Sequence, residues 1–254
     1  MRSYESKGII CVKDKFNFTY YLCEITYILN EDETYKYIFK PNYNVIDLLD
    51  ADLFQGIPGL NIDLRKNEYI RENILPTFIS ERVPSDNRED YYELLEKVSM
   101  EYMDPIQYLI RTDQRYSGDN LFVVGYKEKE TIAISEGLRT NNVIIKQILE
   151  NICKGNDVVV NNQLIDDSNR KAFYNVFYDL YSKAYKNNKI LQSEGIKKAK
   201  SENKYKGRKP KQVDELKFIE LLDKVNRKEL KPKEAAKILN ISIDKYYRLK
   251  KLQN

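Results

Sequence analysis

The stretch SENKYKGRKPK, residues 201–211, divides the chain into two parts. It holds five lysines and arginines in eleven positions, with one glycine and one proline between them. It shows no apolar periodicity, and both glycine and proline oppose helix formation. We therefore predict a basic arm here, between a long helical segment before it and a short helical module after it.

Three short helical segments follow the arm. Residues 213–225, VDELKFIELLDKV, are amphipathic, and the sequence places Leu216, Ile219, Leu222 and Val225 on one side. The segments KPKEAAKILN (231–240) and ISIDKYYRLKKL (241–252) follow, with small residues where two helices would meet closely. Two helices joined by so short a turn are typical of a helix-turn-helix.

The last of these helices is the predicted DNA-reading element. Ser242 is its expected N-cap, and Asp244, Lys245 and Arg248 would project from its first turns. We expect Ile243, Tyr247 and Leu249 on its packed side.

A long helix is predicted before the arm. Between residues 168 and 202 there is no proline and only one glycine, Gly195. Apolar residues recur along it at a spacing of mostly three or four, namely Phe173, Val176, Phe177, Leu180, Ala184, Leu191 and Ala199. Either the helix spans the core of its own chain, or it pairs with a second copy.

The N-terminal part has mixed patterns. Three β-branched and aromatic runs between residues 8 and 39 predict antiparallel strands. Helices are expected over residues 65–79, over 86–100 with Ser85 or Asp86 as N-cap, and after Asp104 with Pro105 in its first position. The runs NLFVVGY (120–126) and ETIAIS (130–135) are expected to form a hairpin.

These patterns predict a fold class and three regions. We expect an α+β domain over residues 1–135, a connecting region with a long dimerisation helix over 136–202, and an all-α helix-turn-helix domain with its basic arm over 203–254.

Composition limits the possible chemistry. The sequence contains no histidine, which excludes histidine-dependent catalysis and histidine-ligated metal. Three widely spaced cysteines and the lack of a signal-peptide pattern favour reduced thiols in the cytoplasm, and no apolar run reaches membrane length. No motif for a nucleotide, metal or other cofactor is present, so we expect none.

Charge is unevenly distributed. Residues 193–254 hold 19 of the 43 lysines and arginines but only 9 of the 39 acidic residues, a net charge of +10. The remaining 192 residues carry −6. An acidic body with a basic tail is typical of a nucleic-acid-binding appendage, although a solvated charged face gives the same count.

Residues 193–211 and 235–251, SEGIKKAKSENKYKGRKPK and AAKILNISIDKYYRLKK, resemble the C-terminal end of serine recombinases of the resolvase and invertase family. Gly195, Ile196, Ala199 and Lys200 match the end of that family's dimer helix, and residues 207–210 match its minor-groove arm. Asp244, Lys245, Tyr247 and Arg248 match its recognition helix, and the resemblance covers roughly residues 157–254. It implies a homodimer on double-stranded DNA.

The resemblance does not extend to catalysis. The family's serine lies in an N-terminal Tyr-x-Arg-x-Ser segment, and residues 1–156 contain no match to it. We therefore expect no serine recombination.

The N-terminal part resembles another family. The segments YIFKPNY, QGIPG, ILPTFISERVPSDNRED and DPIQYLIRTDQRYSGDNLFVV are similar to the N-terminal subdomain of HipA-type toxin kinases. That family's kinase core has no counterpart here. The similarity implies a protein partner for this domain and no phosphotransfer.

The expected function is dimeric, sequence-specific binding of double-stranded DNA, as a transcriptional regulator of a mobile element or defence locus. The expected contacts are Lys204, Lys206, Gly207, Arg208, Lys209, Lys211, Ser242, Asp244, Lys245, Tyr247 and Arg248. No catalytic, cofactor or metal residue is assigned.

Two other functions stay open. One is a DNA endonuclease with an unrecognised N-terminal site, for which Asp86, Asp90 and Glu93 near Lys97 are weak candidates. The other is an interaction protein of toxin–antitoxin type. The segment RTDQRYSGD (111–119) could hold a phosphate, but a structural loop is the preferred interpretation.

Overall fold

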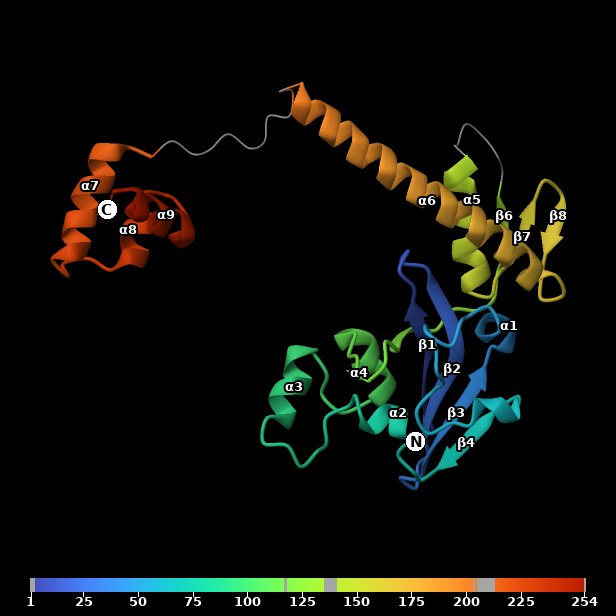
Figure 1. The fold of residues 1–254 in the computed structure, drawn as a ribbon. Helices are drawn as coiled ribbons and strands as arrows, with labels where there is room; N and C mark the ends of the chain where they lie inside the picture. The colour runs from blue at the N-terminus through green and yellow to red at the C-terminus, as the bar shows by residue number, and fades with distance from the viewer. Residues whose placement is uncertain (1–2, 117, 135–140, 203, 205–212, 254) are drawn as a thin grey trace. The chain divides into compact units, whose positions relative to one another are not determined.

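The computed structural model describes residues 3–116, 118–134, 141–202, 204 and 213–253. The chain divides into two compact units, Met1–Asn188 and Lys189–Asn254. Residues 141–188 thus lie in the same unit as the N-terminal sheet. Mixed α+β structure is present as predicted (Figure 1).

A five-stranded antiparallel sheet forms the base of the first unit. Its strands β1 (Tyr4–Lys13), β2 (Thr19–Leu29) and β3 (Tyr35–Pro41) follow one another along the chain and confirm the predicted meander. The strands β4 (Tyr69–Glu72) and β5 (Phe122–Gly125) complete the order β4-β3-β2-β1-β5. Alternate residues of these strands, such as Tyr20, Leu22, Tyr37 and Phe39, are fully buried.

Short helices connect the strands of this sheet. They are α1 (Tyr43–Ile46), the 3-10 helix η1 (Ile62–Leu64), α2 (Thr77–Ser80), α3 (Tyr91–Lys97) and α4 (Pro105–Thr112). Helix α4 begins as predicted. The buried carboxylate of Asp104 accepts hydrogen bonds from the backbone N–H groups of Ile106 and Gln107, and from the hydroxyl of Ser6 at 2.9 Å.

Two predicted helices were wrong in extent or kind. Residues 65–79 contain strand β4 and the four-residue α2 instead of one helix. Pro76 precedes α2, and Arg65 and Asn73 have positive φ angles that a continuous helix does not allow. The second helix, α3, begins only after Asp90, so neither Ser85 nor Asp86 is its N-cap.

The predicted hairpin between residues 120 and 135 was also wrong. Strand β5 pairs with β1, whereas β6 (Thr131–Ile134) belongs to a second sheet. That sheet has the order β6-β7-β8, with β7 (Asp157–Val160) parallel to β6 and antiparallel to β8 (Gln163–Ile165). Helix α5 (Asn141–Cys153) joins the parallel pair, as such a crossover requires.

Helix α6 (Arg170–Ser201) has 32 residues and fulfils the prediction of a long helix. It spans about 48 Å. One side of its first half packs on the β1–β2 hairpin. There the Tyr174 hydroxyl lies 2.8 Å from that of Tyr20, and the Tyr178 hydroxyl donates to Asp14 at 3.0 Å. The ring of Phe16 contacts Tyr178, Tyr181 and Tyr185.

The second unit contains the helices α7 (Glu215–Asn226), α8 (Pro232–Ile238) and α9 (Ile243–Gln253). Its small core consists of Phe218, Leu221, Leu222, Ala235, Ala236 and Tyr246. The predicted inner face of α7 was wrong in part, because Leu216 is 81% exposed and Ile219 is 41% exposed. Phe218 and Leu221 are buried there instead, because the ring of Phe218 fills the space against Tyr246 of α9.

Among the described residues, no helix combines the length and apolar character needed to cross a bilayer.

We predict that Tyr246→Phe stabilises the protein. The Tyr246 hydroxyl is buried and has no hydrogen-bond partner among the described residues. Removing an unpaired buried hydroxyl should raise the free energy of unfolding by about 1 kcal/mol. Urea denaturation followed by circular dichroism measures the change. Tyr174→Phe, which removes a paired hydroxyl, is the matched control and should lower stability.

Candidate nucleic-acid interface

Helix α9 is fixed in the second unit by its inner side. The Ser242 hydroxyl accepts the backbone N–H of Lys245 at 3.3 Å, so Ser242 is the N-cap as predicted. Tyr246 is fully buried, with its ring centroid 5.5 Å from that of Phe218. Ile243 and Leu249 pack beside this core as predicted. Tyr246, rather than the predicted Tyr247, is therefore the anchor of the helix.

The opposite side of α9 presents polar groups to solvent. Asp244, Tyr247, Arg248 and Lys251 are all exposed, and Tyr247 is 52% exposed. Their spacing of three, four and seven residues places them on one helical face, which we call the outer face of α9. Lys245 lies beside this face and is half-buried. The outer face thus combines two cations, one carboxylate and one aromatic ring.

The basic arm lies almost entirely outside the described residues. This applies to the predicted contacts Lys206, Gly207, Arg208, Lys209 and Lys211. Lys204 is described and exposed, and its Nζ atom lies 2.8 Å from a carboxylate oxygen of Glu202.

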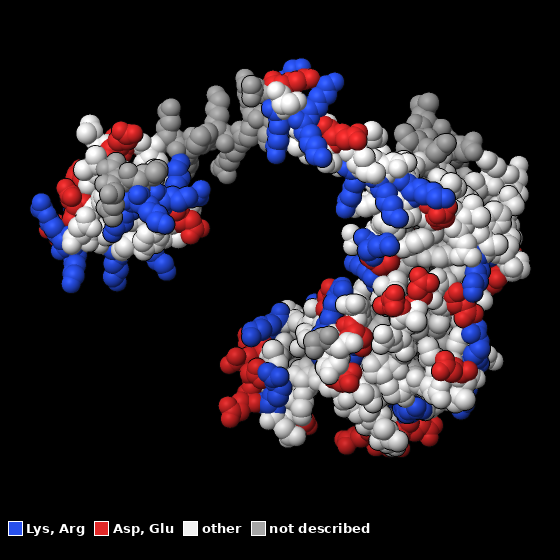
Figure 2. Space-filling view, in the orientation of Figure 1, with Lys and Arg blue, Asp and Glu red and all other residues white. Residues whose placement is uncertain are grey.

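Exposed positive charge is common on the three helices of the second unit. Nine cations between residues 213 and 253 form no ion pair with any residue that the structure describes: Lys217, Arg227, Lys228, Lys231, Lys233, Lys237, Arg248, Lys250 and Lys251. Several carboxylates are already engaged, because Asp214 and Glu234 cap helices and Glu220 pairs with Lys224. Blue side chains accordingly project from this unit in Figure 2. The unit can therefore attract a polyanion.

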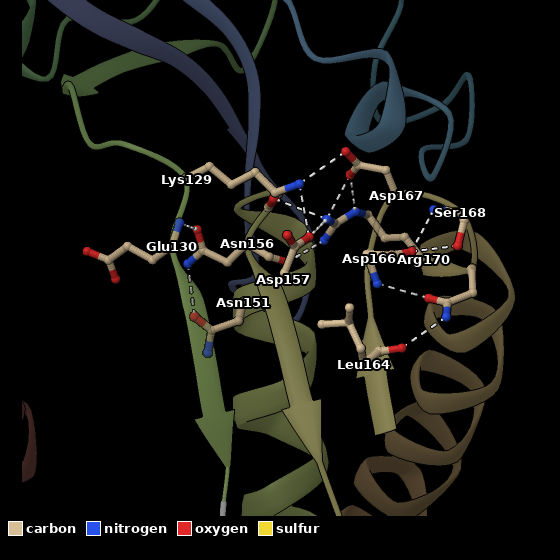
Figure 3. A network of polar contacts seen from close by, with 12 residues as sticks. Lys129, Glu130, Asn151, Asn156, Asp157, Leu164, Asp166, Asp167, Ser168 and Arg170 are labelled. Atoms are coloured by element: carbon tan, nitrogen blue, oxygen red, sulfur yellow. Dashed lines mark hydrogen bonds and ion pairs between the residues drawn. The ribbon is translucent and has the colours of Figure 1, made fainter. Parts of the chain in front are cut away.

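The first unit contains a polar network centred on a buried arginine (Figure 3). Arg170 is 1% exposed, and its Nη2 atom lies 3.0 Å from Asp157 and 2.8 Å from Asp167. Its guanidinium also donates to the backbone carbonyls of Gly155 and Asn156. Lys129 contacts the same two carboxylates at 2.9 and 3.1 Å.

The charges of this network satisfy one another. Burial alone would lower the pKa of Lys129, but hydrogen bonds to Asp157 and Asp167 outweigh it and raise that pKa. Burial would raise the pKa of Asp167, yet Arg170 and Lys129 hold it below its usual value. The two shifts keep Lys129 and Asp167 in their charged forms, and the network joins α6 to the second sheet.

Several of the other acidic and basic candidates also have structural partners. Asp90 pairs with Arg88 at 2.8 Å, and no group of three or more Cys, Asp or Glu in the described ranges could hold a metal ion. In the loop at residues 111–119, Arg111 donates to the backbone carbonyls of Val98 and Ser99. Asp119 binds the buried Arg82, and Ser117 lies outside the described residues.

Sequence reasoning missed one member of the outer face. Lys251 lies one further turn along α9 from Arg248, and its spacing of seven residues from Asp244 was the available signal.

Comparison with known proteins found no family model, no curated protein and no solved structure that matches this chain.

Proposed function

We propose that this chain is a dimeric, sequence-specific double-stranded DNA-binding protein that regulates transcription of a mobile element or defence locus. The observation that carries the proposal is the outer face of α9. It holds Asp244, Tyr247 and Arg248 at helical spacing on a compact three-helix unit with unpaired positive charge. The order α8, short turn, α9 supports a helix-turn-helix, in which the second helix would enter the major groove.

Three residues on or beside the outer face suit a role in reading bases. Arg248 can bind the O6 and N7 atoms of guanine through two parallel hydrogen bonds, and Lys245 can bind the same atoms as a point charge. The carboxylate of Asp244 can accept a hydrogen bond from the cytosine amino group. The lysines of the arm would neutralise phosphates, and Arg208 would enter the minor groove.

The second side of α6 supports dimerisation. Val176, Leu180, Ile190 and Leu191 are 58%, 46%, 55% and 63% exposed. They lie on a helical face other than the one through which Tyr174 and Tyr178 contact the hairpin. Two exposed apolar pairs on one helical face favour pairing with a second copy. Two copies would then bind two half-sites of a palindrome.

Replacing Arg248 by Ala should weaken binding to the preferred DNA by about 1–3 kcal/mol and relax the preference at one or two base pairs. Selection from a random duplex library defines the preferred site, and fluorescence anisotropy measures affinity. Mixed-sequence DNA is the control. Equal losses on both duplexes would show that Arg248 contacts phosphate and reads no base.

Replacing Lys204, Lys206, Lys209 and Lys211 by Ala should weaken binding to all sequences. The slope of log K against log salt concentration should fall by about 0.9 for each phosphate that the arm no longer neutralises, because fewer counterions are released. Titration at several salt concentrations measures the slope. An unchanged slope would exclude the arm from the interface.

Leu191→Glu should shift the chain from dimer to monomer, because two carboxylates would meet in an apolar interface. Binding to the full palindrome should fall sharply, with half-site binding little changed. Analytical ultracentrifugation and anisotropy measure both effects. Leu216→Glu, at an exposed leucine of α7, is the matched control. A wild-type chain that is monomeric both free and on DNA contradicts the model.

A further inference from the structure

The turn between α7 and α8 contains a lysine in an unfavourable backbone conformation. Lys228 has a φ angle of 62°, in the left-handed region. Its N–H donates to the Val225 carbonyl at 3.1 Å, and the N–H of Glu229 donates to the Lys224 carbonyl at 2.9 Å. These two bonds form a Schellman motif, in which the left-handed position is usually glycine.

A lysine is energetically unfavourable at this position. Its Cβ atom crowds the neighbouring carbonyl in the left-handed conformation, whereas glycine avoids the clash. The lysine side chain is exposed and forms no ion pair with a described residue. The turn requires the left-handed conformation but not a lysine, so the charge of this side chain is available for a role outside the fold.

The surroundings of Lys228 indicate the kind of ligand. Arg227, Lys231 and Lys233 are exposed beside it and likewise form no ion pair with a described residue. Glu229 is the one acidic residue between positions 227 and 233. Four cations and one carboxylate in seven residues form a local positive surface, and basic side chains project from the part of the unit where α7 leads into α8 (Figure 2).

We infer that the α7–α8 turn is a phosphate-binding site for duplex DNA, and that Lys228 makes its central contact. The inference rests on the proposed function, because it assigns a further contact to the same partner. Phosphate contacts outside the recognition helix fix the orientation of that helix on the duplex and carry no sequence information. The turn would thus position α9, and Arg248 would read the bases.

Lys228→Gly tests the inference, because it removes the charge and relieves the strain together. The apparent melting temperature should stay constant or rise. Affinity for preferred and mixed-sequence duplexes should fall equally, on the order of fivefold, and the salt slope should fall by about 0.9. Lys228→Gln keeps the strain but removes the charge, so it should lose the same affinity without gaining stability.

Ser99→Gly is the matched control. Ser99 occupies the same position of a Schellman motif after α3, with a φ angle of 55°. This variant should also gain stability or keep it, with DNA affinity unchanged.

The possible outcomes distinguish a failure of the proposed DNA-binding function from a failure of the phosphate site at the α7–α8 turn. A wild-type chain that binds neither duplex overturns the proposed function. A wild-type chain that binds DNA, with Lys228→Gly at unchanged affinity and salt slope, overturns the turn site alone. A lower melting temperature for Lys228→Gly would show that the lysine serves the fold, and would overturn the inference as well.

Discussion

The ion pairs and hydrogen bonds of the buried Arg170 guanidinium are the interactions on which the first unit depends. A buried cation without partners would be strongly destabilising. Here the carboxylates of Asp157 and Asp167 and two backbone carbonyls surround it. The network fixes the first turn of α6 to β7 and to the turn between α5 and β7. It thus defines where α6 begins in the first unit.

Helix α6 has apolar residues on two faces, one covered by its own chain and one exposed. Tyr174 and Tyr178 on one face are held by Tyr20 and Asp14 through buried hydroxyl contacts. Val176, Leu180 and Leu191 remain exposed on another face. A helix held only by its own chain would need one apolar face. The exposed residues of the second face are those on which the proposed dimerisation rests.

Sequence patterns predicted the helices and strands better than they predicted which strands pair with one another. The alternation in β1, β2 and β3 and the Asp104–Pro105 start of α4 were enough to predict them, because these signals are local. The partners of β5 and β6 depend on residues far away, and short apolar runs do not specify them. Residues 65–79 had helical spacing, but the pairing of β4 with β3 overrode it.

The candidate site shows the same limit at the scale of one residue. The sequence correctly indicated Ser242 as the N-cap and an outward Arg248. It predicted Tyr247 in the core, whereas the structure has Tyr246 there. Adjacent tyrosines differ by about 100° around a helix, and only the position of Phe218 on α7 decides between them. The strained lysine at position 228 has no sequence signal, because a φ angle follows from the formed turn.

The contact between the β1–β2 hairpin and α6 joins residues far apart in the sequence. Asp14 and Tyr178 are 164 positions apart, and Tyr20 and Tyr174 are 154 apart. At a synthesis rate of about 5–20 residues per second, the aromatic side of the hairpin stays uncovered for many seconds, until α6 has been made. Phe16 and Phe18 stay accessible to chaperones or to other nascent chains in that interval. The first unit is thus completed only when α6 has left the ribosome.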